Sequence, residues 1–175
     1  MISPGRFIPL AETNGLIRLL TEHVLDRAVR DRASWAVTGH DLTVAVNLSP
    51  LLLTDQGLLP DLLQRLSQYH LSPASLTLEV TESAAMQNPS VTLEILGRLR
   101  LRGFNLALDD FGTGYSNLAL LHRMPFNEMK IDRTFVTVVS ASRDSQVIVS
   151  ALAGLARQFG LATVAEGVED LETWA

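Results

Sequence analysis

Cysteine is absent from this 175-residue chain, aromatic residues make up only 6% of it, and basic residues are outnumbered by acidic ones. The lack of cysteine excludes a disulfide scaffold, a cysteine nucleophile, thiolate zinc and an iron–sulfur cluster. Any metal must therefore bind to oxygen or nitrogen ligands. With 14 Lys and Arg against 19 Asp and Glu, the formal net charge of −5 argues against DNA binding through a broad basic surface.

Long apolar runs are also missing. The longest, from Val147 to Ala156, is about half of the ~20 residues that a membrane span needs. The N-terminus lacks the basic segment and apolar core of a signal peptide. What the chain does contain is 47% hydrophobic residues, enough to bury a core and too many for a disordered chain. We therefore expect one soluble, cytoplasmic, globular domain over residues 1–175.

Strand and helix patterns alternate along the chain. Apolar and polar residues alternate with a period of two, or run as short apolar stretches, in five predicted strands: 41–49, 76–82, 104–110, 128–133 and 162–166. Helical spacing fills the gaps at 16–28 and 59–66, in a helix that begins at Asn88 and Pro89, and in one that begins at Asp144 and ends at Gly160. Strict alternation of strand and helix predicts a parallel sheet in an α/β fold.

Polar residues recur near the carboxyl ends of the predicted strands, opposite in parity to the aliphatic residues. They are Asn47, Glu79, Asp109 and Lys130. An open doubly wound sheet buries both faces and fits this pattern poorly, whereas a (β/α) barrel points one parity inward toward its active face. Glu166 shares its parity with Ala162 and Val164, so we expect it at a strand end rather than within the pleat.

The most distinctive motif follows the third predicted strand. Asp109 and Asp110 are adjacent carboxylates, which repel each other unless a cation lies between them. The motif continues with Phe111, Gly112, Thr113, Gly114, Tyr115 and Ser116. Its glycines allow a tight turn and close approach to a ligand. A metal site is one interpretation, and a loop whose acidic groups cap the next helix is the alternative.

Other polar residues also leave two interpretations open. Glu82, three residues after Glu79, is either part of a site or a helix cap, and Asn47 either offers a carbonyl oxygen or bonds to backbone. An inward Lys130 must be paired, through a structural salt bridge or in a catalytic role. The four histidines lack metal-ligand spacing, and neither GxGxxG nor GxxxxGK[ST] occurs.

Six motifs occur in order along the chain. They are Phe-Ile-Pro-Leu-Ala-Glu at 7–12, Val-Asn-Leu-Ser at 46–49, Glu-Val-Thr-Glu-Ser at 79–83, Asp-Asp-Phe-Gly-Thr-Gly-Tyr-Ser at 109–116, Lys-Ile-Asp-Arg at 130–133 and Val-Ala-Glu-Gly-Val-Glu at 164–169. Together these six motifs resemble the EAL-domain family of bacterial cyclic di-GMP phosphodiesterases. They are spread over almost the whole chain.

The resemblance implies a modified TIM barrel that hydrolyses cyclic di-GMP to linear pGpG with two Mg²⁺ or Mn²⁺ ions. The metal ligands that it implies are Asn47, Glu79, Asp109, Asp110 and Glu166. It also gives Lys130 contact with the attacking water, places Glu166 among the catalytic residues, and makes Glu82 the anchor of the loop that contains residues 111–116. Two ions would activate water and neutralise charge in the transition state.

The family's Glu-Ala-Leu and Gln-Gly-Tyr motifs do not occur in these 175 residues. We therefore expect a partial barrel of about five of the eight strands. Three interpretations follow: a phosphodiesterase with little or no activity in isolation, a non-catalytic module that binds cyclic di-GMP or a protein, or a chain that completes its barrel by strand exchange. The candidate partners that follow from the resemblance are cyclic di-GMP, a second copy of this chain, and GGDEF, PAS or other sensory domains.

Overall fold

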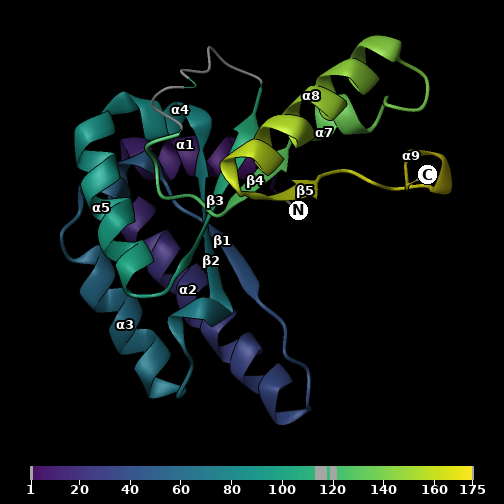
Figure 1. The fold of residues 1–175 in the computed structure, drawn as a ribbon. Helices are drawn as coiled ribbons and strands as arrows, with labels where there is room; N and C mark the ends of the chain where they lie inside the picture. Colours follow the sequence, from purple (N-terminus) through teal and green to yellow (C-terminus); the bar gives the residue numbers. More distant parts are fainter. Residues whose placement is uncertain (1, 113–117, 119–121, 175) are drawn as a thin grey trace.

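A computed structural model of the chain describes residues 2–112, 118 and 122–174 (Figure 1). Within these residues, five parallel strands form one sheet in the order in which they occur along the chain. The strands are β1 (Val44–Asn47), β2 (Leu76–Thr81), β3 (Asn105–Phe111), β4 (Glu128–Ile131) and β5 (Ala162–Ala165). The five predicted strands and the predicted parallel sheet are confirmed.

Helices and 3₁₀ turns connect the strands. They are α1 (Pro4–Thr13), α2 (Ile17–Val37), η1 (Pro50–Thr54), α3 (Leu58–Gln68), η2 (Pro73–Ser75), α4 (Glu82–Gln87), α5 (Pro89–Leu101), α7 (Arg133–Val136), α8 (Arg143–Phe159) and α9 (Leu171–Trp174). The four predicted helices are confirmed as α2, α3, α5 and α8. No helix in the described part of the chain has both the length and the hydrophobicity to cross a membrane.

The ends of α8 illustrate how local chemistry sets a helix. Ser142, rather than the predicted Asp144, is the N-cap, because its hydroxyl oxygen accepts a hydrogen bond from the backbone N–H of Ser145 at 3.2 Å. Asp144 lies in the first turn, where a negative charge favours the helix dipole. Gly160 ends the helix as predicted, in a left-handed conformation with φ 71° that favours glycine.

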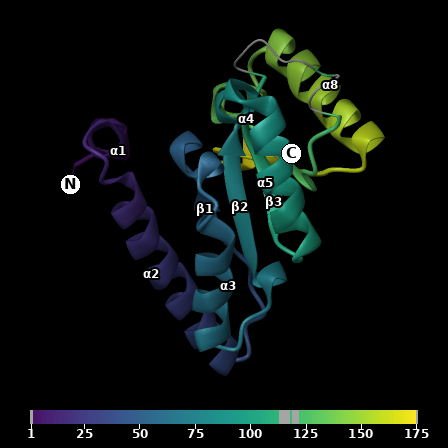
Figure 2. The ribbon, with the colours of Figure 1, turned by 90° about the vertical axis from the view of Figure 1, so that its left-hand side faces the viewer.

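The hydrophobic core lies between the sheet and the helices on one of its faces. Figures 1 and 2 show α3 and α5 covering β1 to β3, while α8 lies beside β4 and β5. Buried leucines from both layers meet there: Leu62 and Leu66 of α3, Leu96 and Leu99 of α5, Leu78 of β2, and Leu106 and Leu108 of β3. Burying this apolar surface drives the packing of the two layers.

The polar side chains of the strands lie on the opposite face of the sheet. The register pairs Asn47 with Glu79 and Thr81 with Asp109, so these side chains share one face and one end of the sheet. The register also pairs Lys130 with Val164. Glu166, two residues beyond Val164, therefore keeps the inward parity.

Glu166 directly follows the last residue of β5, so its expected position at a strand end is confirmed. The parity that it shares with Ala162 and Val164 does not conflict with its inward direction, because β5 is exposed along its whole length and these two residues do not mark a core-facing side. Where neither face is buried, apolar residues no longer report which way a strand faces.

Candidate metal centre

The carboxyl ends of the strands bring the predicted polar residues to one edge of the sheet. Glu79 in β2, Asp109 in β3 and Lys130 in β4 are buried, with 6%, 7% and 8% of their surfaces exposed. Asn47 ends β1 and is exposed. Because charged groups are rarely buried without partners, the contacts among these side chains determine what the site can do.

A β-bulge places two adjacent carboxylates at this edge. Leu108 pairs with Met129 and Phe111 pairs with Ile131, so Asp109 and Asp110 together lie opposite Lys130 alone. Asp110 adopts a left-handed conformation with φ 55°, which is uncommon outside glycine. In a regular strand, the two side chains would point to opposite faces, whereas the bulge allows both to serve one site.

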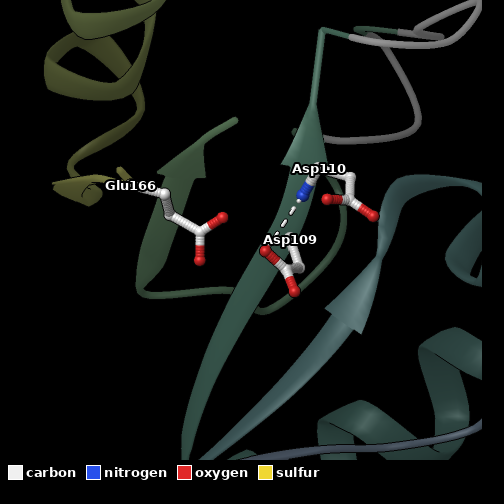
Figure 3. Close-up of side chains that lie close together, drawn as sticks. All are labelled: Asp109, Asp110 and Glu166. Atoms are coloured by element: carbon white, nitrogen blue, oxygen red, sulfur yellow. Dashed lines mark hydrogen bonds between the residues drawn. The ribbon is translucent and has the colours of Figure 1, made fainter. Parts of the chain in front are cut away.

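Asp109, Asp110 and Glu166 form an acidic triad. Each offers one carboxylate oxygen, and these oxygens lie within 4.8 Å of one another. Figure 3 shows the Glu166 side chain reaching toward the two aspartates, while the backbone N–H of Asp110 donates to Oδ1 of Asp109 at 3.1 Å. A compact set of carboxylate oxygens suits a hard divalent cation such as Mg²⁺ or Mn²⁺. The residues therefore fit the predicted ion type.

Lys130 is paired with three carboxylates. Its Nζ lies 2.8 Å from Oε1 of Glu79, 3.1 Å from Oδ1 of Asp109 and 2.6 Å from Oε1 of Glu166. Burial alone would lower the pKa of Lys130, but hydrogen bonds to Glu166 and Glu79 outweigh burial and raise the pKa above its usual value. The ammonium is therefore charged at neutral pH, and the pairing that an inward lysine requires is present. Its predicted contact with the attacking water stays a prediction.

The carboxyl groups of the site influence one another. Burial raises the pKa of Asp110, and the negative charges of Asp109, Asp132 and Glu166 raise it further. Asp132 behaves differently, because a hydrogen bond from the Thr134 hydroxyl, more than any other contact, holds the pKa of Asp132 below its usual value. The negative charges that raise the pKa of Asp110 would favour a cation beside its carboxylate.

Asn47 and Glu79 lie outside the triad and are joined to it through Lys130. The Asn47 side-chain amide donates to Oε2 of Glu79 at 2.9 Å, while the other oxygen of Glu79 contacts Lys130. The hydrogen bond holds the two strand ends in a fixed relation. Asn47 and Glu79 are thus positioned at the site, and their predicted role as metal ligands stays a prediction.

Glu82 begins α4 and faces the segment that follows β3. Its Oε2 accepts a hydrogen bond from the backbone N–H of Gly112 at 3.2 Å. The helix cap is Thr81, whose hydroxyl accepts from the N–H of Ala84, so the capping interpretation of Glu82 is wrong. Phe111 is buried. The predicted ligand or loop residues Thr113, Gly114, Tyr115 and Ser116 lie outside the described residues.

Two features near the site were not predicted from the sequence. Asp132 is buried and lies beside Asp110, although its position after β4 also suits an ordinary N-cap, a role that it fills for α7. Ser49 lies two residues after Asn47, and its hydroxyl donates a hydrogen bond to Glu12 of α1 at 2.7 Å. Asp132 belongs to the motif at 130–133 and Glu12 to the motif at 7–12. Their place in these motifs was the sequence feature that could have predicted a role near the site.

Gly167 directly follows Glu166 of the acidic triad, and its replacement by alanine tests whether the close packing at Gly167 positions Glu166. Its φ is 76°, and an added Cβ would lie 2.9 Å from Cβ of Arg133 and 3.1 Å from Cγ2 of Thr137. We expect Gly167→Ala to lower the free energy of unfolding by about 1–3 kcal/mol in urea and to weaken stabilisation by Mg²⁺. Gly154→Ala is the control, because nothing lies within 4 Å of the Cβ that the alanine would add there. Equal behaviour of the two variants would contradict this role.

Comparisons with known proteins agree with this geometry. The EAL domain family matches residues 1–175. The chain is 46% identical over 170 residues to the bifunctional diguanylate cyclase/cyclic di-GMP phosphodiesterase MucR of Pseudomonas aeruginosa, and 44% identical over 170 residues to the cyclic di-GMP phosphodiesterase NbdA of the same species. These matches cover 97% of this chain in both cases, but only 25% of MucR and 22% of NbdA.

A solved structure extends the likeness to three dimensions. The PaMucR phosphodiesterase, in complex with c-di-GMP, superimposes with a TM-score of 0.93 at 45% identity, covering 98% of this chain and 70% of that one. The predicted fold, part of an EAL barrel, is therefore confirmed. The match along the full sequence, the identity to the two relatives and the shared fold all agree: the chain belongs to the EAL domain family.

Proposed function

We propose that this chain forms the metal-binding face of a cyclic di-GMP phosphodiesterase, which hydrolyses one phosphodiester of cyclic di-GMP to linear pGpG. The observation that carries the proposal is the triad of Asp109, Asp110 and Glu166 around a paired Lys130, at the carboxyl ends of the strands of an EAL domain. In barrels of this type, that end of the sheet is where active sites form.

The relatives support the choice of substrate. MucR and NbdA are named as cyclic di-GMP phosphodiesterases, and the PaMucR structure is a complex with c-di-GMP. The chain spans about a quarter of the length of these two relatives, and we propose that it shares their phosphodiesterase activity.

The residues proposed to hold Mg²⁺ or Mn²⁺ are the triad together with Asn47 and Glu79. Divalent ions bound there would supply Lewis acidity and lower the pKa of a bound water. We propose that the site binds either ion, because oxygen ligands accept both Mg²⁺ and Mn²⁺. An acidic chain with a net charge of −5 also needs such cations to bind a doubly charged phosphodiester ligand.

The chain's own side chains supply order and charge. The Lys130 ammonium is a positive charge at the reaction face, where it would attract the phosphate and the water that attacks it. The hydrogen bond from Asn47 orients Glu79. Glu82 holds the backbone of Gly112 and thereby the start of the segment after β3.

We expect the 175-residue chain by itself to have little activity. Asn47 is exposed, and β5, which leads to Glu166, is exposed along its length, so bulk water competes for the hydrogen bonds and ion pairs that must order the site. The assay therefore uses the chain in molar excess over cyclic di-GMP, with Mn²⁺ or with a chelator, and separates the products by chromatography.

The products decide between two functions. Conversion to pGpG alone, suppressed by the chelator, would support the phosphodiesterase. Binding of cyclic di-GMP without any product would favour the non-catalytic module, and the absence of both binding and product would contradict the proposal.

The proposal also extends to the partners of the chain and to its location in the cell. MucR joins a diguanylate cyclase to its phosphodiesterase, which supports a GGDEF or sensory neighbour and gives no support to DNA. A second copy of the chain is a further proposed partner, because β1 and β5 are the outer strands of the described sheet. The lack of cysteine fits work in the reducing cytoplasm.

A further inference from the structure

Lys130 is the only lysine in the 175 residues, since the other 13 cationic side chains are arginines. It is also buried, with 8% of its surface exposed, whereas lysine is almost never buried unless it is paired. Its ammonium contacts Glu79, Asp109 and Glu166 at 2.6–3.1 Å. A compact ammonium on a flexible stem can change partners more readily than a planar guanidinium.

The partners of Lys130 overlap with the acidic triad. Asp109 and Glu166 belong to both sets, and Oδ1 of Asp109 also accepts from the backbone N–H of Asp110. A divalent cation on these carboxylates would stand close to the ammonium, and two positive charges in a buried site repel each other. The cation and the ammonium therefore compete for Asp109 and Glu166.

We propose that Lys130 is the internal counter-ion of the metal-free site, and that a divalent cation binds by displacing its ammonium from Asp109 and Glu166. This inference rests on the metal site of the proposed function. In the metal-free chain, Lys130 neutralises carboxylates that would otherwise repel one another, so it stabilises the fold. The same contacts weaken the apparent affinity for metal, because they must be broken first.

The first test is Lys130→Met, which keeps the length of the side chain and removes its charge. We expect the metal-free variant to unfold at a lower temperature than the wild type. We also expect its apparent Kd for Mg²⁺, from thermal unfolding at increasing Mg²⁺, to fall by about tenfold or more. Arg157→Met is the matched control, because Arg157 is exposed on α8 and loses the same charge. Its Kd for Mg²⁺ should match that of the wild type.

The second test needs no variant and decides the matter if Lys130→Met does not fold. With ¹⁵N-labelled lysine, the wild-type chain has one side-chain ammonium signal by nuclear magnetic resonance. We expect that signal to shift, and its protons to exchange faster with water, over the Mg²⁺ range that stabilises the fold.

The outcomes separate this proposal from the metal site itself. An unchanged lysine signal while Mg²⁺ stabilises the wild type, or an unchanged or weaker Mg²⁺ affinity of Lys130→Met, would overturn the displacement and leave the metal site standing. No response to Mg²⁺ in the wild type, in either measurement, would overturn both.

Discussion

Replacing Asp109 with asparagine is expected to abolish the response of this chain to divalent cations. Asp109 belongs to the acidic triad, contacts Lys130 at 3.1 Å and accepts the backbone N–H of Asp110. The amide keeps the shape of the side chain but removes the negative charge that a hard cation requires. We expect Mg²⁺ affinity, measured by calorimetry, to fall by more than about 100-fold, since even the loss of an outer contact costs 10–100-fold.

The control for Asp109→Asn is Glu94→Gln. Glu94 is exposed on α5, so the variant removes one negative charge from the surface without touching the triad. Its Mg²⁺ affinity should equal that of the wild type, and both variants should unfold cooperatively. If Asp109→Asn bound Mg²⁺ as tightly as Glu94→Gln, the cation site would lie elsewhere.

Phe104→Ala is expected to produce the largest loss of stability. Phe104 precedes β3, is fully buried and belongs to the core between the sheet and the helices. Truncating a buried phenylalanine removes apolar contacts and leaves a cavity, which costs about 3–5 kcal/mol. For a domain of this size, we expect a fall in the unfolding temperature of roughly 10 °C, measured by circular dichroism.

Leu101→Ala is the matched control for this truncation. Leu101 ends α5 only three residues before Phe104, but it is 88% exposed. Its truncation should change the free energy of unfolding by less than about 0.5 kcal/mol. Similar losses for the two variants would show that the core does not lie where the structure places it.

The alternation of residues in β2 and β3 was sufficient to predict which face carries the site. Helices cover one face of these strands, so Leu78 and Leu106 face the core while Glu79 and Asp109 face away. A sheet with one apolar and one polar side imprints a period of two on its strands. This alternation is sufficient to predict the cluster of polar residues at the strand ends.

Other features of the structure cannot be predicted from the sequence pattern. The bulge at Asp109 and Asp110 is a matter of hydrogen-bond register between β3 and β4, which residue types do not report. The inward parity of Glu166 was missed because β5 is exposed on both faces. Ser142 and Asp144 are both good N-caps, so only the backbone geometry selects Ser142.

The site itself shows the same division. Paired carboxylates at Asp109 and Asp110, and the need of Lys130 for a partner, follow from residue chemistry. The identity of those partners depends on which strand ends meet in space. The contacts of Lys130 with Glu79 and Glu166 join segments that are far apart in the sequence, and only the fold brings them together.

The most direct test of the proposed site is the binding of cyclic di-GMP to the wild-type chain, measured by calorimetry with Mg²⁺ and again with a chelator. The account predicts binding that requires Mg²⁺, because the ligand is an anion and the site consists mainly of carboxylates held around one ammonium. Binding of equal strength in the chelator, or no binding in either condition, would contradict it.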